Sequence, residues 1–173
     1  MNIIDKKLWE EFNKKVPNIN IIEKIISEGG DINSLDNGST LLHRFLDNIL
    51  EKVNFYETDK KGNIIPFSNN IPDKNDEEKL KLLFKYGINP NIYKEDDYSC
   101  LYTSCIICLP EYVKILLENG AKPDNNKEEN FIKLINEWID DDNDFRNIKD
   151  DIDRNKNMNV IIDLLKENNR KMY

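Results

Sequence analysis

The stretch from Ser99 to Gly120 most constrains the fold, because its apolar side chains recur at the spacing of amphipathic helices. That spacing predicts two short helices. Pro110 stands at their junction, where its fixed φ and missing N–H suit the first turn of the second helix. Gly120 is expected to end that helix, since glycine adopts the left-handed conformation after a helix without steric cost. The stretch therefore predicts a helix, a tight turn, a second helix and a glycine stop.

The glycine stop recurs along the chain at a regular interval. Gly87 precedes Gly120 by 33 residues, and Gly29 precedes Gly87 by 58, which is one such period plus a further 25 residues. A period of about 33 residues is typical of stacked helical repeats. An unrelated segment over residues 51–76 accounts for the excess, so we expect an insertion there.

Apolar periodicity and breakers predict further elements on both sides of this stretch. Thr40 is expected to cap a helix that follows a loop over residues 31–39. The apolar content of the insertion predicts a folded loop with a short hairpin around Lys61-Gly62-Asn63. Asn168 is expected to end the last helix in place of a glycine. Helices are expected over residues 5–14, 19–27, 77–87, 130–139 and 159–169.

The third repeat resembles an ankyrin repeat, whose consensus opens with Thr-Pro-Leu-His, continues with Ala-Ala and closes with Leu-Leu-Leu-Glu, one variable position and Gly-Ala. The residues that stand at its consensus positions are Ser99, Cys100, Leu101, Tyr102, Ser104, Cys105, Glu111, Lys114, Ile115, Leu116, Leu117, Glu118, Gly120 and Ala121. The second repeat departs from the consensus at its Ala pair, where Phe45 and Leu46 stand.

The resemblance implies an all-α fold, an ankyrin-repeat solenoid of helix-turn-helix units with finger loops. It implies one domain over residues 1–173. The repeats are expected over residues 1–30, 31–87 with the insertion 51–76, 88–120, and 121–173 with a second insertion over 140–157.

Charge and composition narrow the function. The chain has a net charge of -8 and a pI near 4.8, which disfavours nucleic acid and anionic membranes and favours a basic protein as partner. No uninterrupted apolar segment indicates a signal peptide or a membrane span. We therefore expect a cytoplasmic protein, monomeric when free.

Three groups of residues resemble chemical sites. Cys105 and Cys108 have the C-x-x-C spacing of zinc and redox sites, but no second pair exists, and we interpret them as packed core. His43, the one histidine, matches the His of the consensus, whose family role is structural. The aspartates of the second insertion, Asp140, Asp142, Asp144 and Asp151, echo a calcium loop but lack its glycine. We expect no catalytic residue, no metal and no cofactor.

In the ankyrin family, the finger tips and the inner face of each first helix bind partner proteins. The residues of this chain at those positions are Asp36, Asn37, Ser39, Asp47, Asn48, Tyr93, Glu95, Asp96, Tyr98, Ile106 and Ile107. Ile106 and Ile107 are apolar at positions expected to be exposed, so they are either interface anchors or residues packed on the fourth repeat.

The resulting hypothesis is a non-catalytic interaction module, an inhibitor or immunity-type protein that neutralises a partner such as a basic toxin. An alternative is an effector or host-range protein of an intracellular bacterium or virus that binds a host protein. A third possibility is a regulatory subunit or enzyme that uses the acidic insertion for metal.

Overall fold

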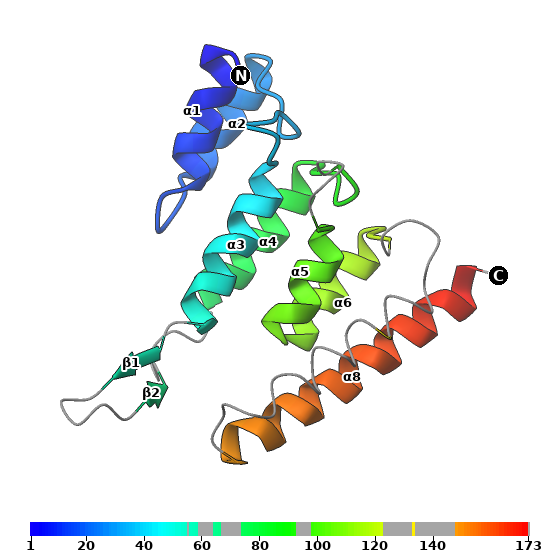
Figure 1. Cartoon of the computed structure of the whole chain (residues 1–173). Coiled ribbons are helices and arrows are strands. Elements are labelled where there is room, and N and C mark those ends of the chain that lie inside the picture. The colour runs from blue at the N-terminus through cyan, green and yellow to red at the C-terminus, as the bar shows by residue number, and fades with distance from the viewer. Residues whose placement is uncertain are drawn as a thin grey trace. The chain divides into compact units, whose positions relative to one another are not determined.

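The computed structural model describes residues 1–54, 56–58, 64–66, 74–92, 98–122, 133 and 148–172. The chain divides into two compact bodies, Met1–Glu95 (the N-terminal body) and Asp96–Tyr173 (the C-terminal body). Regular structure in the described ranges is helical apart from one short hairpin (Figure 1). The predicted all-α class is confirmed, whereas the ankyrin solenoid stays a prediction.

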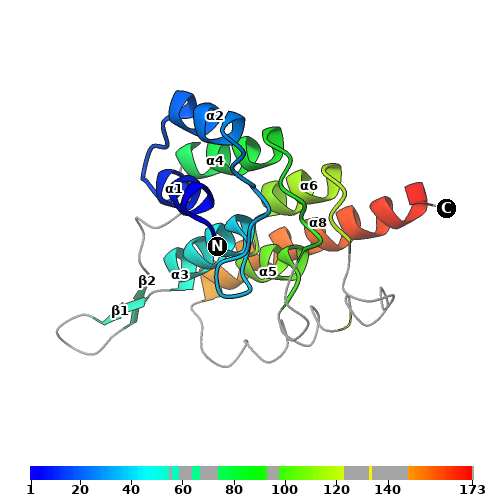
Figure 2. The ribbon, with the colours of Figure 1, turned by 90° about the horizontal axis from the view of Figure 1, so that it is seen from above.

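The N-terminal body contains four helices and the hairpin within its described ranges. Helices α1 and α3 lie in one layer, and α2 and α4 lie in a second layer beside it (Figure 2). The elements are α1 Ile3–Phe12, α2 Ile19–Ser27, α3 Leu41–Asn54, β1 Tyr56–Thr58, β2 Ile64–Pro66 and α4 Lys74–Lys85.

Helix α1 begins earlier than expected, and side-chain capping explains why. The Asn2 side chain accepts the N–H of Asp5 at 2.8 Å, so the helix begins at Ile3 and ends at Phe12. The predicted range of residues 5–14 was therefore displaced by two residues at each end. Helix α2 has the predicted bounds and is capped by Asn18, whose side chain accepts the N–H groups of Asn20 and Ile21.

A buried carboxylate holds the turn between α1 and α2. Glu11 is only 4% exposed, and its Oε1 accepts the N–H of Asn18 at 2.8 Å. Its Oε2 lies 2.5 Å from Nζ of Lys14. The bond from Lys14, followed by the bond from Asn18, lowers the pKa of Glu11 below its ordinary value although burial opposes this. The ionised carboxylate therefore fixes the start of α2 against the end of α1.

The predicted hairpin of the insertion is confirmed. Strands β1 and β2 pair antiparallel, with Glu57 opposite Ile65, while the residues of the expected turn, 61–63, lie outside the described ranges. The insertion is shorter than expected, because α3 continues to Asn54 and α4 begins at Lys74.

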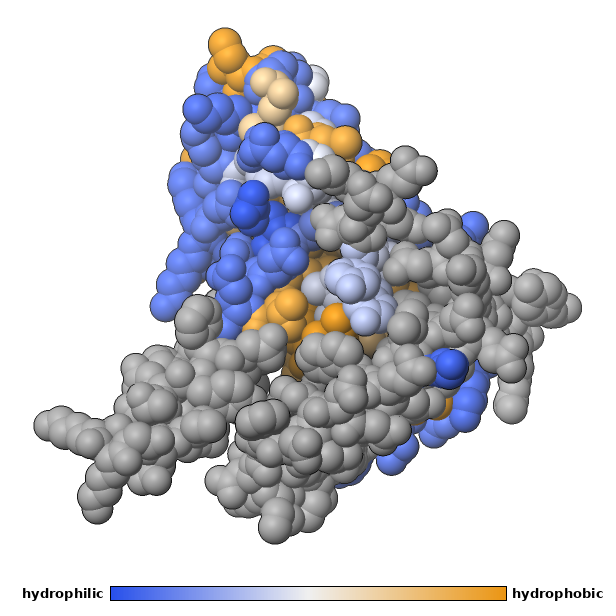
Figure 3. Space-filling model, in the orientation of Figure 1, coloured by the Kyte–Doolittle hydropathy of each residue, from blue (hydrophilic) through white to orange (hydrophobic). Residues whose placement is uncertain are grey.

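Leucine and isoleucine side chains from all four helices form the core of the N-terminal body. Burying each such side chain stabilises the fold by about 1.5–3 kcal/mol. The face that carries α1 is mostly hydrophilic (Figure 3). The fully buried members of this core are Leu8, Ile22, Leu42, Leu46, Ile49, Leu80 and Leu83.

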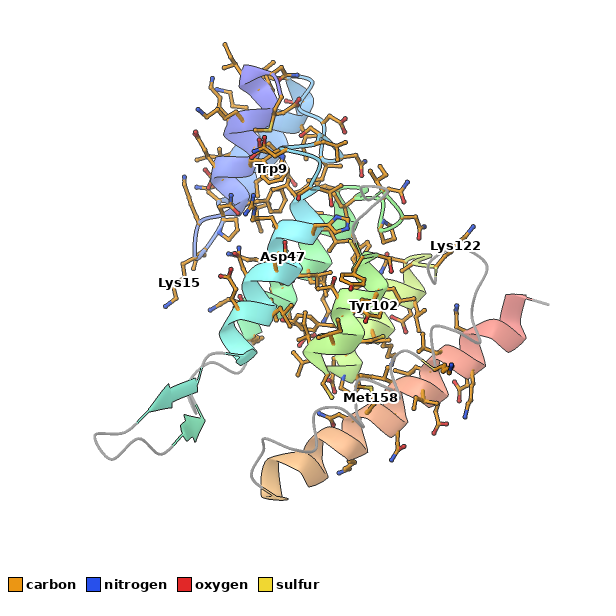
Figure 4. The ribbon with its side chains drawn as sticks, in the orientation of Figure 1. Trp9, Lys15, Asp47, Tyr102, Lys122 and Met158 are labelled. Carbon is orange, nitrogen blue, oxygen red and sulfur yellow. The ribbon has the colours of Figure 1, made fainter. Side chains whose placement is uncertain are left out.

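The C-terminal body contains a helical hairpin, α5 Cys100–Ile107 and α6 Pro110–Glu118, and the long helix α8 Ile148–Met172. Helix α8 packs on α6, and its side chains Met158, Ile161 and Leu165 are at most 3% exposed. Met158 points from α8 toward the hairpin (Figure 4). The side-chain amide of Asn157 adds a hydrogen bond of 3.3 Å to the carbonyl of Cys108.

Two expectations for the last repeat were wrong. Asn168 does not end a helix, because α8 continues through it to Met172. Residues 148–157, assigned to the second insertion, form the first turns of the same helix. The helix expected over residues 130–139 lies outside the described ranges except at Lys133.

Candidate functional site

Three glycine stops have the same backbone geometry. Gly29, Gly87 and Gly120 have φ values of 98°, 82° and 80°. Each glycine N–H donates to the carbonyl three residues earlier, and the next N–H donates to the carbonyl five residues earlier. These bonds satisfy carbonyls at the end of α2, α4 and α6 in the same way. The recurrence predicted from sequence is therefore a recurrence of structure.

The loops after the first two stops also match. The Asp31 side chain accepts the N–H of Asn33 at 2.8 Å, and the Asn89 side chain accepts the N–H of Asn91 at 2.9 Å. The Asn33 amide joins the two loops: its Nδ2 donates to the carbonyl of Gly87 at 3.2 Å, and its Oδ1 accepts the N–H of Asn89 at 2.7 Å. This bridge was not predicted from the sequence. The repeated spacing of Asn33 and Asn91 after their glycines was the available signal.

Helices α3 and α5 begin with the same kind of cap. Oγ1 of Thr40 accepts the N–H of His43 at 3.2 Å, as expected, and Oγ of Ser99 accepts the N–H of Tyr102 at 3.1 Å. All four residues are buried. Each cap satisfies a free N–H of the first turn and fixes the direction of the loop that precedes the helix.

The loop before α3, which was predicted to be a finger loop, contains a tight two-residue turn. Asp36 and Ser39 exchange both backbone hydrogen bonds at 3.0 Å. Asn37 and Gly38 between them have φ values of 52° and 87°, as a hairpin turn of this kind requires. Asn37 is exposed, while Asp36 and Ser39 are half-buried. The turn therefore presents the Asn37 side chain to solvent.

The two residues of α3 that were predicted to bind a partner are exposed. Asp47 and Asn48 lie on α3 and are open to solvent, and Asp47 is labelled in Figure 4. Together with Asp36, Asn37 and Ser39 they define what we call the α3 surface. All of its members belong to the N-terminal body.

A small hollow borders the α3 surface. Phe45, half-buried, lines it together with Phe12, Asn48 and Lys79. Its volume of about 40 Å³ is far below the several hundred cubic ångströms of small-molecule sites. The hollow therefore suits one inserted side chain better than a metabolite.

An exposed aromatic ring marks the corresponding surface of the C-terminal body. Tyr98 is 61% exposed, and its ring stacks on that of Tyr102, with centroids 4.5 Å apart and planes inclined by 18°. Tyr102 is only 7% exposed and lies in α5 (Figure 4). We call Tyr98 and the half-buried Ile106 the α5 surface. Three other predicted members, Tyr93, Glu95 and Asp96, lie outside the described ranges.

The expected exposure of Ile107 was wrong. Ile107 is 4% exposed, and Ile106 is half-buried. Helix α5 ends at Ile107 because Cys108 adopts a left-handed conformation, with φ of 62°. The interpretation of Ile107 as an exposed interface anchor was therefore wrong, while its packing on the fourth repeat stays a prediction.

Cys100, Cys105 and Cys108 form no disulfide and are buried, and burial is what the packed-core interpretation of Cys105 and Cys108 predicts. Burial raises the pKa of the Cys105 thiol far above its ordinary value, so it carries no nucleophilic thiolate. Cys108 lies just beyond the end of α5. Within the described ranges, no three His, Cys, Asp or Glu side chains gather as metal ligands. The calcium-loop aspartates of residues 140–144 lie outside those ranges.

Comparison with known proteins identifies no relative: no family model, no curated protein and no solved structure matches this chain. Every helix in the described part of the chain is too short or too polar to cross a membrane.

Proposed function

We propose that this chain is a non-catalytic ankyrin-repeat protein that binds and neutralises another protein with a basic surface, such as a toxin. The matching glycine stops, the matching caps of α3 and α5 and the two-residue finger turn support the ankyrin assignment. Repeats of this kind present exposed loop tips and helix faces for binding.

The observation that carries the proposal is that the exposed Tyr98 stacks on the buried ring of Tyr102. Tyr98 is 61% exposed, yet one face of its ring stacks on the ring of Tyr102, which restricts its orientation. A tyrosine that is already ordered loses little conformational freedom when a partner covers it, and tyrosine is enriched among residues that dominate binding energy. Tyr98 is therefore the central contact that we assign to the α5 surface.

Charge supports a basic partner. The whole chain carries a net charge of -8, and Asp36 and Asp47 place carboxylates on the α3 surface. Such a charge accelerates encounter with a basic protein and makes the association rate sensitive to salt.

The test is quantitative affinity capture with three baits: the wild-type chain, Tyr98→Ala and Val160→Ala. Val160 is the control, because it is 42% exposed in the same body but lies on α8 and is not a member of the α5 surface. We expect a basic protein that is enriched by the wild type and by Val160→Ala and lost with Tyr98→Ala, and whose activity the purified chain suppresses.

The same captures separate an immunity-type inhibitor from the alternative, an effector that binds a host protein. A partner from the chain's own cell supports an immunity-type inhibitor, whereas a partner found only in host lysate supports an effector. Equal enrichment by all three baits would contradict binding through the α5 surface, and capture of a partner whose activity is unaffected would contradict neutralisation.

A further inference from the structure

Two Asn-Gly steps lie within the described ranges, Asn37-Gly38 in the finger turn and Asn119-Gly120 at the end of α6. Both asparagines are exposed, but their backbones are held differently. We propose that Asn37 is a site of spontaneous deamidation and isoaspartate formation, and that the fold protects Asn119 from the same reaction. This inference concerns a chemical modification and does not depend on the proposed function.

The reaction uses groups of the chain and water. The N–H of the glycine loses its proton, and the nitrogen lone pair attacks Cγ of the asparagine to form a five-membered ring. The glycine proton passes through water to the side-chain nitrogen, which leaves as ammonia and gives a succinimide. Water then opens the ring at either carbonyl and yields aspartate or isoaspartate. The net change is addition of one water and loss of one ammonia, without oxidation or reduction.

At Asn119, hydrogen bonds hold both reacting groups. The N–H of Gly120, the nucleophile, donates to the carbonyl of Leu117 at 3.1 Å, and Nδ2 of Asn119 donates to the carbonyl of Ile115 at 2.8 Å. The next residue, Ala121, is 3% exposed and donates to the carbonyl of Leu116 at 3.0 Å. Attack therefore requires several bonds of the helix end to break together and a buried residue to move.

At Asn37, the hydrogen bonds flank the reacting groups instead of holding them. The two bonds between Asp36 and Ser39 close the turn. Among the hydrogen bonds of the described residues, none uses the N–H of Gly38 or the side chain of Asn37. Opening of this one small loop lets the Gly38 nitrogen reach Cγ of Asn37. Loop tips open at a lower free-energy cost than packed helix ends.

The product changes the finger in a defined way. Isoaspartate places an extra methylene in the backbone between residues 37 and 38, so the two-residue turn no longer matches the pairing of Asp36 with Ser39. It also adds one carboxylate to a chain that already carries a net charge of -8. The modification therefore alters both the shape and the charge of the finger tip.

The test incubates the full wild-type chain at physiological temperature and mildly alkaline pH, natively and in denaturant. Peptide mass spectrometry with fragmentation that separates aspartate from isoaspartate follows residues 37 and 119 over time. In the native protein we expect Asn37 to react about tenfold faster than Asn119 or more, since each hydrogen bond that must break slows attack roughly two- to tenfold. In denaturant we expect the two rates to converge, because both steps are Asn-Gly.

Three results would overturn the proposal. Equal native rates, or a faster reaction at Asn119, would show that the fold gives no protection there. A rate difference that persists in denaturant would place the cause in neighbouring sequence. Formation of aspartate alone at position 37 would exclude the succinimide route.

Discussion

Oγ1 of Thr40 lies 2.8 Å from Nδ1 of His43 and also accepts the backbone N–H of His43 at 3.2 Å. One hydroxyl thus caps α3 and orients the imidazole, and both residues are at most 5% exposed. The pair lies directly after the turn closed by Ser39, so it fixes the finger loop to the helix.

Thr40→Ala should destabilise the protein by about 1–2 kcal/mol, the usual cost of losing a helix N-cap. Thr40→Ser keeps the hydroxyl and should retain most of the stability. Urea unfolding of the three proteins, followed by circular dichroism, provides the comparison. Equal stability of the alanine and serine variants would show that the cap contributes nothing.

Gly87→Ala should destabilise the protein by about 1–2 kcal/mol, because residue 87 has a left-handed backbone that an L side chain adopts at a cost. An added Cβ would meet no atom within 4 Å, so conformation alone sets this cost. Gly87→Asn should lose less, since asparagine tolerates the conformation. A stability of Gly87→Ala at or above wild type would contradict the glycine-stop geometry.

Stability should fall as the pH drops from the ordinary pKa of Glu11, 4.5, through its lower value in the folded protein. The sign follows from the lowered pKa: the unfolded chain binds the proton more readily, so protonation favours unfolding. Glu11→Gln should cost about 1 kcal/mol at neutral pH through weakened hydrogen bonds, and it should lose less stability on acidification. Parallel pH profiles for wild type and variant would contradict this role.

Asn168→Gly should be less stable than Asn168→Ala by about 0.5–1 kcal/mol, because the residue lies inside α8. The opposite order is expected if Asn168 ends the helix, since glycine is the best residue for a left-handed cap. Thermal unfolding of the two variants distinguishes the two structures directly.

Local signals in the sequence predicted much of the fold correctly. Pro110 at the first turn of α6 and the glycines after α2, α4 and α6 act through their own backbone preferences, which do not depend on distant residues. The Thr40 cap and the hairpin of the insertion were also predicted correctly from local signals. The start of α1 also had a local signal, because Asn2 stands three residues before Asp5 as a capping pair does.

Tertiary contacts explain what the sequence did not predict. Asp5 is buried because its carboxylate accepts the N–H of Asp31, 26 residues away, at 2.9 Å. Ile107, the last residue of α5, is buried, although the ankyrin resemblance placed it on an exposed face. For the candidate site, exposure of Asp47, Asn48 and Tyr98 was predicted correctly, but the stacking on Tyr102 required the structure.

The most direct test of the central claim is the dissociation constant of the captured partner, measured by calorimetry for wild type, Tyr98→Ala, Tyr98→Phe and Val160→Ala. We predict a Kd at least about tenfold higher for Tyr98→Ala, as loss of a central aromatic contact implies. Tyr98→Phe keeps the ring and should bind nearly as wild type, and Val160→Ala should be unchanged. A Tyr98→Ala protein that unfolds as wild type does and binds with an unchanged Kd would contradict recognition through the α5 surface.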